Sequence, residues 1–188
     1  MEVPSRPHLV TMAAALAVVR ALEAMGAPGC TIKWPNDVLD PLGRKVCGLL
    51  TDSVARGAGR PPALVAGIGI NVAQREEDFP PALRGRAASA SLAAGRPVAR
   101  AALLARFLEE LETALALSDA TLFRAWERRC STLGRMVRAR LAGRAPLVGH
   151  VLGVEGDGSL VLRLESGIQE RVRSADVEEV RVQEEPGA

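Results

Sequence analysis

The chain has 188 residues, of which 48% are hydrophobic and 24% charged, and its formal net charge is +2. This composition is that of a folded protein rather than a disordered one, and the nearly balanced charge argues against a nucleic-acid partner. The three cysteines lack metal-ligand spacing, so we expect reduced thiols in a cytoplasmic protein. No apolar run approaches the length of about 20 residues that spans a bilayer, so no membrane is expected.

The first expected element is an alanine-rich helix from His8 to Gly26, with Gly26 as its C-cap. Its apolar residues recur near helical spacing, and Arg20 and Glu23 share one polar face, which distinguishes the helix from a signal peptide. The apolar residues are Leu9, Met12, Leu16, Val19 and Leu22.

The stretch from Thr31 to Leu50 predicts a hairpin-like β-turn-β unit. A β-leaning run, Thr31–Trp34, meets Pro35, which cannot donate to a strand ladder, and the next two residues favour a turn. A second turn at Asp40–Gly43 then leads to the apolar run Val46–Leu50. This geometry should bring together Lys33, Asp37 and Lys45.

A buried strand is expected from Leu64 to Val72, with Gly67 and Gly69 on one face. A strand interior without side chains usually means that a ligand or another backbone comes close. The polar segment from Arg75 to Arg86 predicts a loop with at most one helical turn, at Pro80–Leu83.

Two helices should follow and cover one face of the sheet, Val98–Leu117 and Ala120–Leu133, the second with Ser118 as its N-cap. We expect the acidic residues of the first helix to lie opposite its apolar stripe. The stripe consists of Ala102, Leu104, Phe107, Leu108, Leu111 and Leu115.

From Gly134 onward the pattern changes to short strands separated by turns, which predicts a small all-β barrel at 134–183 and a disordered tail at 184–188. The predicted fold is therefore α+β, with a mixed sheet covered by helices in residues 1–133. The five expected strands are Met136–Leu141, Leu147–Val154, Leu160–Leu164, Gln169–Val172 and Val177–Val182.

The residues of the first domain suit chemistry on an activated acyl group. Lys45 can neutralise a carboxylate or a developing phosphate charge, and Asp37 can accept a proton from an incoming amine. Gly67 and Gly69 would leave room for a flat ligand, and Asn71 could reach a phosphate oxygen or a Mg²⁺-bound water. Each residue alone also has a structural explanation: surface ion pairs for the charged groups, and a tight sheet–helix contact for the glycines.

Three ordered segments resemble the central motifs of biotin protein ligases: KWPND at 33–37, RKVCGLL at 44–50 and GIGINV at 67–72. In that family KWPND, K-x-x-G-[IL]-L and G-x-G-[IL]-N segments line one pocket. The resemblance continues weakly through 88–92 and 124–135. It implies a class II synthetase-like catalytic domain followed by a small Src-homology-type barrel.

The resemblance implies a two-step reaction in which biotin and MgATP give biotinyl-adenylate, and a lysine of a biotin carboxyl carrier protein domain then attacks it. Lys45 corresponds to the lysine that contacts the biotin carboxylate and the α-phosphate, and Asp37 to the proposed base. A homodimer is possible. The remaining binding residues are Lys33, Asn36, Gly48, Gly67, Gly69 and Asn71, and no protein metal ligand is expected.

Family members carry a Gly/Arg-rich loop of the type GRGRRGR-x-W upstream of KWPND, and this chain does not. We therefore expect a truncated catalytic domain with impaired activity, and no DNA-binding helix-turn-helix. The alternative is a catalytically deficient remnant that binds nucleotide or a partner protein. The arginines of the barrel suggest nucleic-acid binding, but stacking aromatics are missing, and a docking surface for an acidic carrier domain fits them better.

Overall fold

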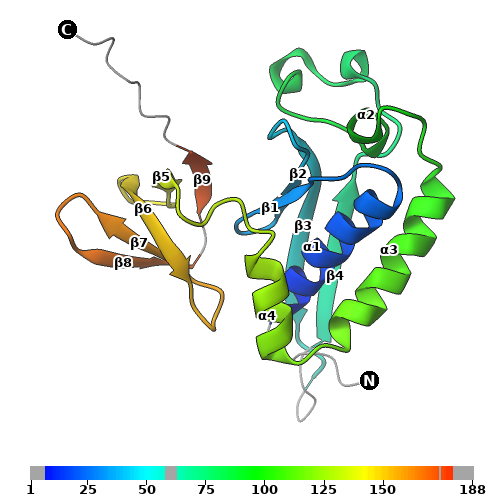
Figure 1. Ribbon diagram of the computed structural model, residues 1–188. Coiled ribbons are helices and arrows are strands. Elements are labelled where there is room, and N and C mark those ends of the chain that lie inside the picture. The colour runs from blue at the N-terminus through cyan, green and yellow to red at the C-terminus, as the bar shows by residue number, and fades with distance from the viewer. Residues whose placement is uncertain (1–6, 58–62, 174, 180–188) are drawn as a thin grey trace, which may run out of the picture. The chain divides into compact units, whose positions relative to one another are not determined.

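The computed structural model describes residues 7–57, 63–173 and 175–179. The chain divides into two compact units, Met1–Cys130 and Ser131–Ala188, and each is described by itself. The first unit holds helices and a four-stranded sheet, and the second holds five strands (Figure 1). The predicted α+β class is confirmed, whereas the tail at 184–188 lies outside the described residues.

Helix α1 (Pro7–Ala24) is the core of the first unit. It packs on all four strands and on helices α3 (Arg100–Leu115) and α4 (Asp119–Glu127), so it is buried on every side rather than along one stripe (Figure 1). Gly26, at φ +90°, follows the helix in the left-handed conformation, as predicted. By length and composition α1 could span a membrane, contrary to expectation, but 67% of it is buried within the unit, as in the core helix of a folded domain.

The sheet of the first unit is an antiparallel meander, and its order follows the chain. The named strands are antiparallel throughout, not mixed as predicted, and within the described residues parallel pairing is limited to two isolated bridges. The predicted hairpin over 31–50 missed β2, because the turn is completed before Asp37 and that residue already begins a strand. The strands are β1 (Thr31–Lys33), β2 (Asp37–Leu39), β3 (Lys45–Val54) and β4 (Ala63–Ile70).

The two faces of this sheet differ in what covers them. The inner face packs on α1 and buries Ile32, Val38 and Leu49. On the outer face the described residues place no helix, and Leu50 and Val65 are 62% and 55% exposed. The prediction that β4 is buried is wrong: none of its residues is buried, because β4 is the edge strand of the described sheet.

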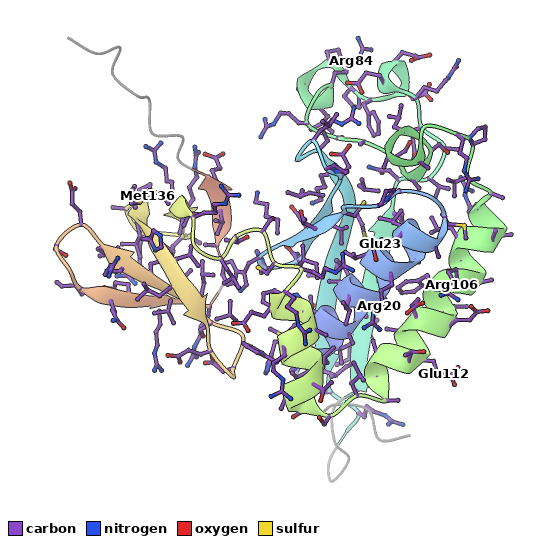
Figure 2. The ribbon with its side chains drawn as sticks, viewed as in Figure 1. Arg20, Glu23, Arg84, Arg106, Glu112 and Met136 are labelled. Carbon is purple, nitrogen blue, oxygen red and sulfur yellow. The ribbon has the colours of Figure 1, made fainter. Side chains whose placement is uncertain are left out.

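The face of α3 that packs against α1 is rotated around the helix axis relative to the predicted apolar stripe. Leu103 is buried, whereas Leu104 and Leu108 are more than half exposed. Consecutive apolar residues in this helix fit two overlapping stripes, and spacing alone could not choose between them. Glu110, expected on the polar face, instead lies in the seam with α1, where it pairs with Arg106 at 2.6 Å and with Arg20 at 3.7 Å. Figure 2 labels the two arginines, one on α1 and one on α3.

The segments on either side of α3 also depart from expectation. The polar loop forms two 3-10 turns rather than one, η1 (Glu76–Asp78) and η2 (Pro81–Leu83), and a short helix α2 (Ala90–Ala94) follows. Helix α4 begins as predicted, with the Ser118 side chain accepting the amide hydrogen of Thr121. It ends at Glu127, well before Leu133, because the chain turns there and the Arg129 carbonyl accepts the Ile32 amide of β1.

The second unit is an antiparallel sheet with the order β8-β7-β6-β5-β9. Its buried residues alternate along the strands and include Val137, Val151, Leu160 and Leu162. Among the described residues the end strands β8 and β9 do not pair, so the sheet is open and the expected closed barrel is not formed. The strands are β5 (Met136–Arg140), β6 (Leu147–Val154), β7 (Leu160–Leu164), β8 (Gln169–Val172) and β9 (Asp176–Glu179).

A glycine in β6 fixes the approach of β6 to β7 and gives a stability prediction. A Cβ at Gly149 would lie 2.8 Å from the Arg163 carbonyl oxygen, so Gly149→Ala must push the two backbones apart. We expect it to lower the free energy of unfolding by about 1–3 kcal/mol, measured by urea denaturation. The matched control is Gly153→Ala in the same strand, where nothing lies within 4 Å, and an equal loss in both variants would contradict the steric explanation.

Candidate functional site

One residue from each strand of the first sheet contributes to a row across its outer face. Directly opposed residues of antiparallel strands project to the same face, with Cβ atoms about 4.5–5.5 Å apart. The register therefore brings together residues that the sequence analysis selected from three separate segments. In order from β1 to β4, the opposed residues are Lys33, Asp37, Gly48 and Gly69.

Lys45 joins this row because β3 contains a β-bulge. Leu39 opposes Lys45 and Val38 opposes Cys47, which leaves Val46 as the extra residue. Residues three apart in a regular strand would project to opposite faces, but the bulge puts Lys45 on the same face as Gly48. The two consecutive buried side chains, Val46 and Cys47, mark the same irregularity.

The Lys45 side chain lies over Gly48 and reaches Asp37. Its Nζ is 2.5 Å from the Asp37 Oδ1, with the lysine side chain 48% exposed and the aspartate 19%. A Cβ at Gly48 would lie 3.1 Å from both Cε and Nζ of Lys45. Glycine therefore leaves the space in which the lysine crosses the strand, and the ammonium and carboxylate are held together at the surface.

The glycines of β4 are open to solvent. Both Gly67 and Gly69 are exposed, and an added Cβ would make only ordinary contacts, 3.9 Å and 3.7 Å from strand carbonyl oxygens. The alternative that they form a tight sheet–helix contact is therefore wrong for the described part of the chain. Their lack of side chains leaves the outer face flat beside Lys45.

Asn36 and Asn71 lie near the row, but their side-chain amides bond to the backbone. The Asn36 Nδ2 donates to the Leu49 carbonyl at 2.5 Å, which ties the β1–β2 turn to β3. The Asn71 Nδ2 donates to the Ala88 carbonyl at 3.0 Å. The Ala88 amide in turn donates to the Lys45 carbonyl at 2.8 Å, so Asn71 braces the segment that runs beside the lysine.

Sequence reasoning missed a chain of contacts that fixes the other side of Lys45. Asp40, only 2% exposed, accepts the Arg44 backbone amide at 2.8 Å and pairs with its guanidinium at 2.7 Å. Arg44 also lies 3.7 Å from Glu76, whose carboxylate accepts the Gly85 amide at 2.6 Å. The loop held in this way supplies the Arg86 carbonyl that accepts the Lys45 amide. The Asp-Pro turn before Arg44 was the one available signal.

Cys47 lies beneath the row and is a protonated core thiol. Burial raises its pKa to about 12, the Asp37 carboxylate adds to the rise, and Lys45 opposes it. Burial likewise raises the pKa of Cys30 to about 11. All three cysteines of the chain are buried and free of disulfides, as the sequence analysis expected.

These two thiols predict a loss of stability in alkaline solution. Above pH 9 the unfolded thiols ionise while the folded ones stay neutral, so the stabilisation is complete below pH 9 and is lost as pH rises towards 11 and 12. The free energy of unfolding should fall by about 1.4 kcal/mol per pH unit for each thiol, measured by urea denaturation. The chain has no tyrosine to add to the effect. An unchanged slope in Cys47→Ala would contradict the assignment.

Comparison with family models and curated proteins gives a consistent result. The model described as "Biotin protein ligase C terminal domain" matches residues 132–178. The chain is 32% identical over 170 residues to the biotin–[acetyl-CoA-carboxylase] ligase of Paracoccus denitrificans, covering 85% of this chain and 68% of that protein. It is 34% identical over 173 residues to the bifunctional ligase/repressor BirA of Bacillus spizizenii, covering 90% of this chain and 52% of the relative, so it spans about half the length of that protein.

Solved structures agree with the curated relatives. The biotin protein ligase of Aquifex aeolicus in complex with biotin and ATP superposes with a TM-score of 0.73 at 25% identity, covering 93% of this chain and 73% of the other. Another crystal structure of the Aquifex ligase gives a TM-score of 0.76 at 24% identity, which supports the fold.

Proposed function

This chain belongs to the biotin protein ligase family, and from that premise we propose that the outer face of its first sheet activates biotin with ATP and transfers it to a protein lysine. The acceptor would be a lysine of a biotin carboxyl carrier protein domain. The observation that carries the proposal is the row across β1 to β4, which Lys45 joins through the bulge. Residues from three separate segments converge there, as a pocket for an acyl-adenylate requires.

In the first step, the biotin carboxylate attacks the α-phosphate of ATP and pyrophosphate leaves. Negative charge accumulates on the phosphate oxygens in the transition state, and the Lys45 ammonium lies where it can stabilise that charge. Lys33, in the same row, would add a second positive charge. The flat surface at Gly67 and Gly69 accepts the ligand without steric conflict.

In the second step, the carrier lysine attacks the acyl carbon and AMP leaves. Asp37 is the one carboxylate in the row, and it is suited to take the proton from the attacking amine. It does so while Lys45 Nζ holds its other side in position. Adenylation thus depends mainly on Lys45, and transfer on Asp37.

Mg²⁺ would enter with the nucleotide rather than in a protein cage. Among the described residues no group of three or more His, Cys, Asp and Glu side chains is placed to hold a metal ion. Mg²⁺ usually keeps several waters and binds through substrate phosphates and one or two carboxylates, which fits a row whose one carboxylate is Asp37.

The two steps can be tested separately on the 188-residue chain. Biotin-dependent exchange of pyrophosphate into ATP reports adenylation, and streptavidin blotting of a carrier domain reports transfer. We propose slow turnover for these residues by themselves, because they include no Gly/Arg-rich loop to cover the adenylate. Binding of biotinyl-adenylate without either activity would favour the alternative of a catalytically deficient remnant. Absence of both activities and of biotinyl-adenylate binding would contradict the proposal.

The setting of the proposed reaction follows from the same premise. We propose a cytoplasmic enzyme, supported by three free cysteines, with the carrier domain as partner and without nucleic acid or membrane. Size-exclusion chromatography with light scattering, with and without biotin and ATP, would determine the oligomeric state.

Gly48→Ala tests whether the space under Lys45 matters. The added Cβ would displace the Lys45 ammonium by a few tenths of an ångström or more, and small misplacements of this kind cost about ten- to a hundredfold in rate. We expect slower adenylation with little change in stability, because the flexible end of a lysine moves easily. In a double-mutant cycle Gly48→Ala should have no further effect once Lys45 is alanine, and additive losses would contradict the mechanism.

A further inference from the structure

The chain contains only two lysines, and both lie in the row. Of its 24 basic residues, 22 are arginines, and the lysines are Lys33 and Lys45. An arginine guanidinium stays protonated at any physiological pH and is not an acyl acceptor, whereas a lysine amine can be. Every side-chain amine that an acyl-adenylate could modify on this protein therefore lies in the row where, on the proposed function, that adenylate is formed.

The two amines are held differently. Lys45 is paired with Asp37, and its ammonium is occupied by that contact. Lys33 lies directly opposite the same carboxylate in the neighbouring strand, is half-buried, and has no ion pair within the described residues. Its amine is thus free to move over the row, next to the group proposed as the base for an attacking amine.

We propose that Lys33 is a site of self-acylation, at which the ligase consumes its own biotinyl-adenylate when no carrier protein is present. The inference rests on the proposed function. The Lys33 Nζ attacks the acyl carbon of the mixed anhydride, a C–N amide bond forms, and the C–O bond to phosphate breaks. AMP leaves with the bonding electron pair, and the Asp37 carboxylate takes the proton lost by the amine.

This modification would act as a brake on the site. Conversion of the Lys33 amine to an amide removes a positive charge from the row and places the biotinyl group over it. The modified protein should therefore form new adenylate more slowly than the unmodified protein. Carrier protein competes for the same intermediate, so the brake would be set only when acceptor is scarce.

The experiment supplies synthetic biotinyl-adenylate, so that it does not depend on adenylation. The chain is incubated without carrier, and acylated positions are identified by mass spectrometry of peptides, which separates Lys33, Lys45 and the α-amine. Lys33→Arg is the loss-of-site variant. Arg100→Lys is the positional control, because Arg100 is exposed at the start of α3 and its replacement puts an amine outside the row.

We expect label at Lys33 at least tenfold above that at Lys45 and at the amine introduced by Arg100→Lys, and its loss in Lys33→Arg. Equal label at the introduced amine would overturn the proposal, since it would mean that free adenylate acylates any exposed amine. No label at Lys33 would overturn it as well. Pyrophosphate exchange with biotin and ATP, run in parallel, shows separately whether the proposed adenylation fails.

Discussion

Lys45→Ala is expected to lower biotin-dependent pyrophosphate exchange by about 10²- to 10³-fold, the usual loss when one group that stabilises transition-state charge is removed. Lys45 Nζ is the cation that the bulge turns onto the row, and it lies against Asp37 at 2.5 Å. Its side chain is 48% exposed, so its removal should change the free energy of unfolding by no more than about 1 kcal/mol. Lys45→Ala should therefore lower adenylation activity strongly while leaving the free energy of unfolding nearly unchanged.

The controls for Lys45 use the same strand. Asp52→Ala changes an exposed charge of β3 on the same face, opposite Val65, and should leave exchange unchanged. Lys45→Arg keeps the charge but replaces a compact ammonium with a broad planar group, and should recover little activity. Wild-type exchange in Lys45→Ala with its fold intact would mean that this lysine is not the group that acts on the phosphate.

Asp37→Asn should lower transfer to the carrier by about 10²- to 10⁴-fold while leaving adenylation within about tenfold of wild type. The amide is the same size as the carboxylate and can still accept a hydrogen bond from the Lys45 Nζ, but it is not a base. Single-turnover transfer from preformed biotinyl-adenylate, followed on a streptavidin blot, isolates the second step.

Asp52→Asn is the matched control for Asp37→Asn, because it neutralises an exposed carboxylate of the same sheet face away from the row. Raising the pH should partly restore transfer in Asp37→Asn, since more of the carrier lysine is then already deprotonated. Equal losses in both steps would contradict a role as base and indicate that Asp37 acts only by holding Lys45.

Local sequence signals predicted most of the helices and strands, because helix-capping residues and turn residues act on the backbone at short range. Gly26, which has no side chain, follows α1 with a positive φ, and the Ser118 side chain caps the first turn of α4. The strand ranges of the second unit were predicted closely, since glycine-containing turns separate them. The site residues were predicted as a set through ordered motifs, and the registers place four of them side by side.

What failed depends on contacts between distant segments. Nothing local says that β4 is an edge strand, so its apolar run predicted burial that it does not have. The choice between Leu103 and Leu104 as the packed face of α3 is made by α1. Nothing local indicated that the Asn71 Nδ2 donates to the carbonyl of Ala88, seventeen residues further on, and the expected contact of Asn71 with a ligand stays a prediction.

The bulge at Val46 determines how many positions separate Lys45 and Gly48 in the sequence. A lysine and a glycine three positions apart share a face only because one residue between them is surplus to the ladder. Deleting Val46 would restore a regular strand in which Lys45 and Gly48, then two positions apart, still share the outer face. The separation of three positions is therefore tied to the bulge, because a regular strand would need the lysine and the glycine two positions apart to place both on the face that holds the row.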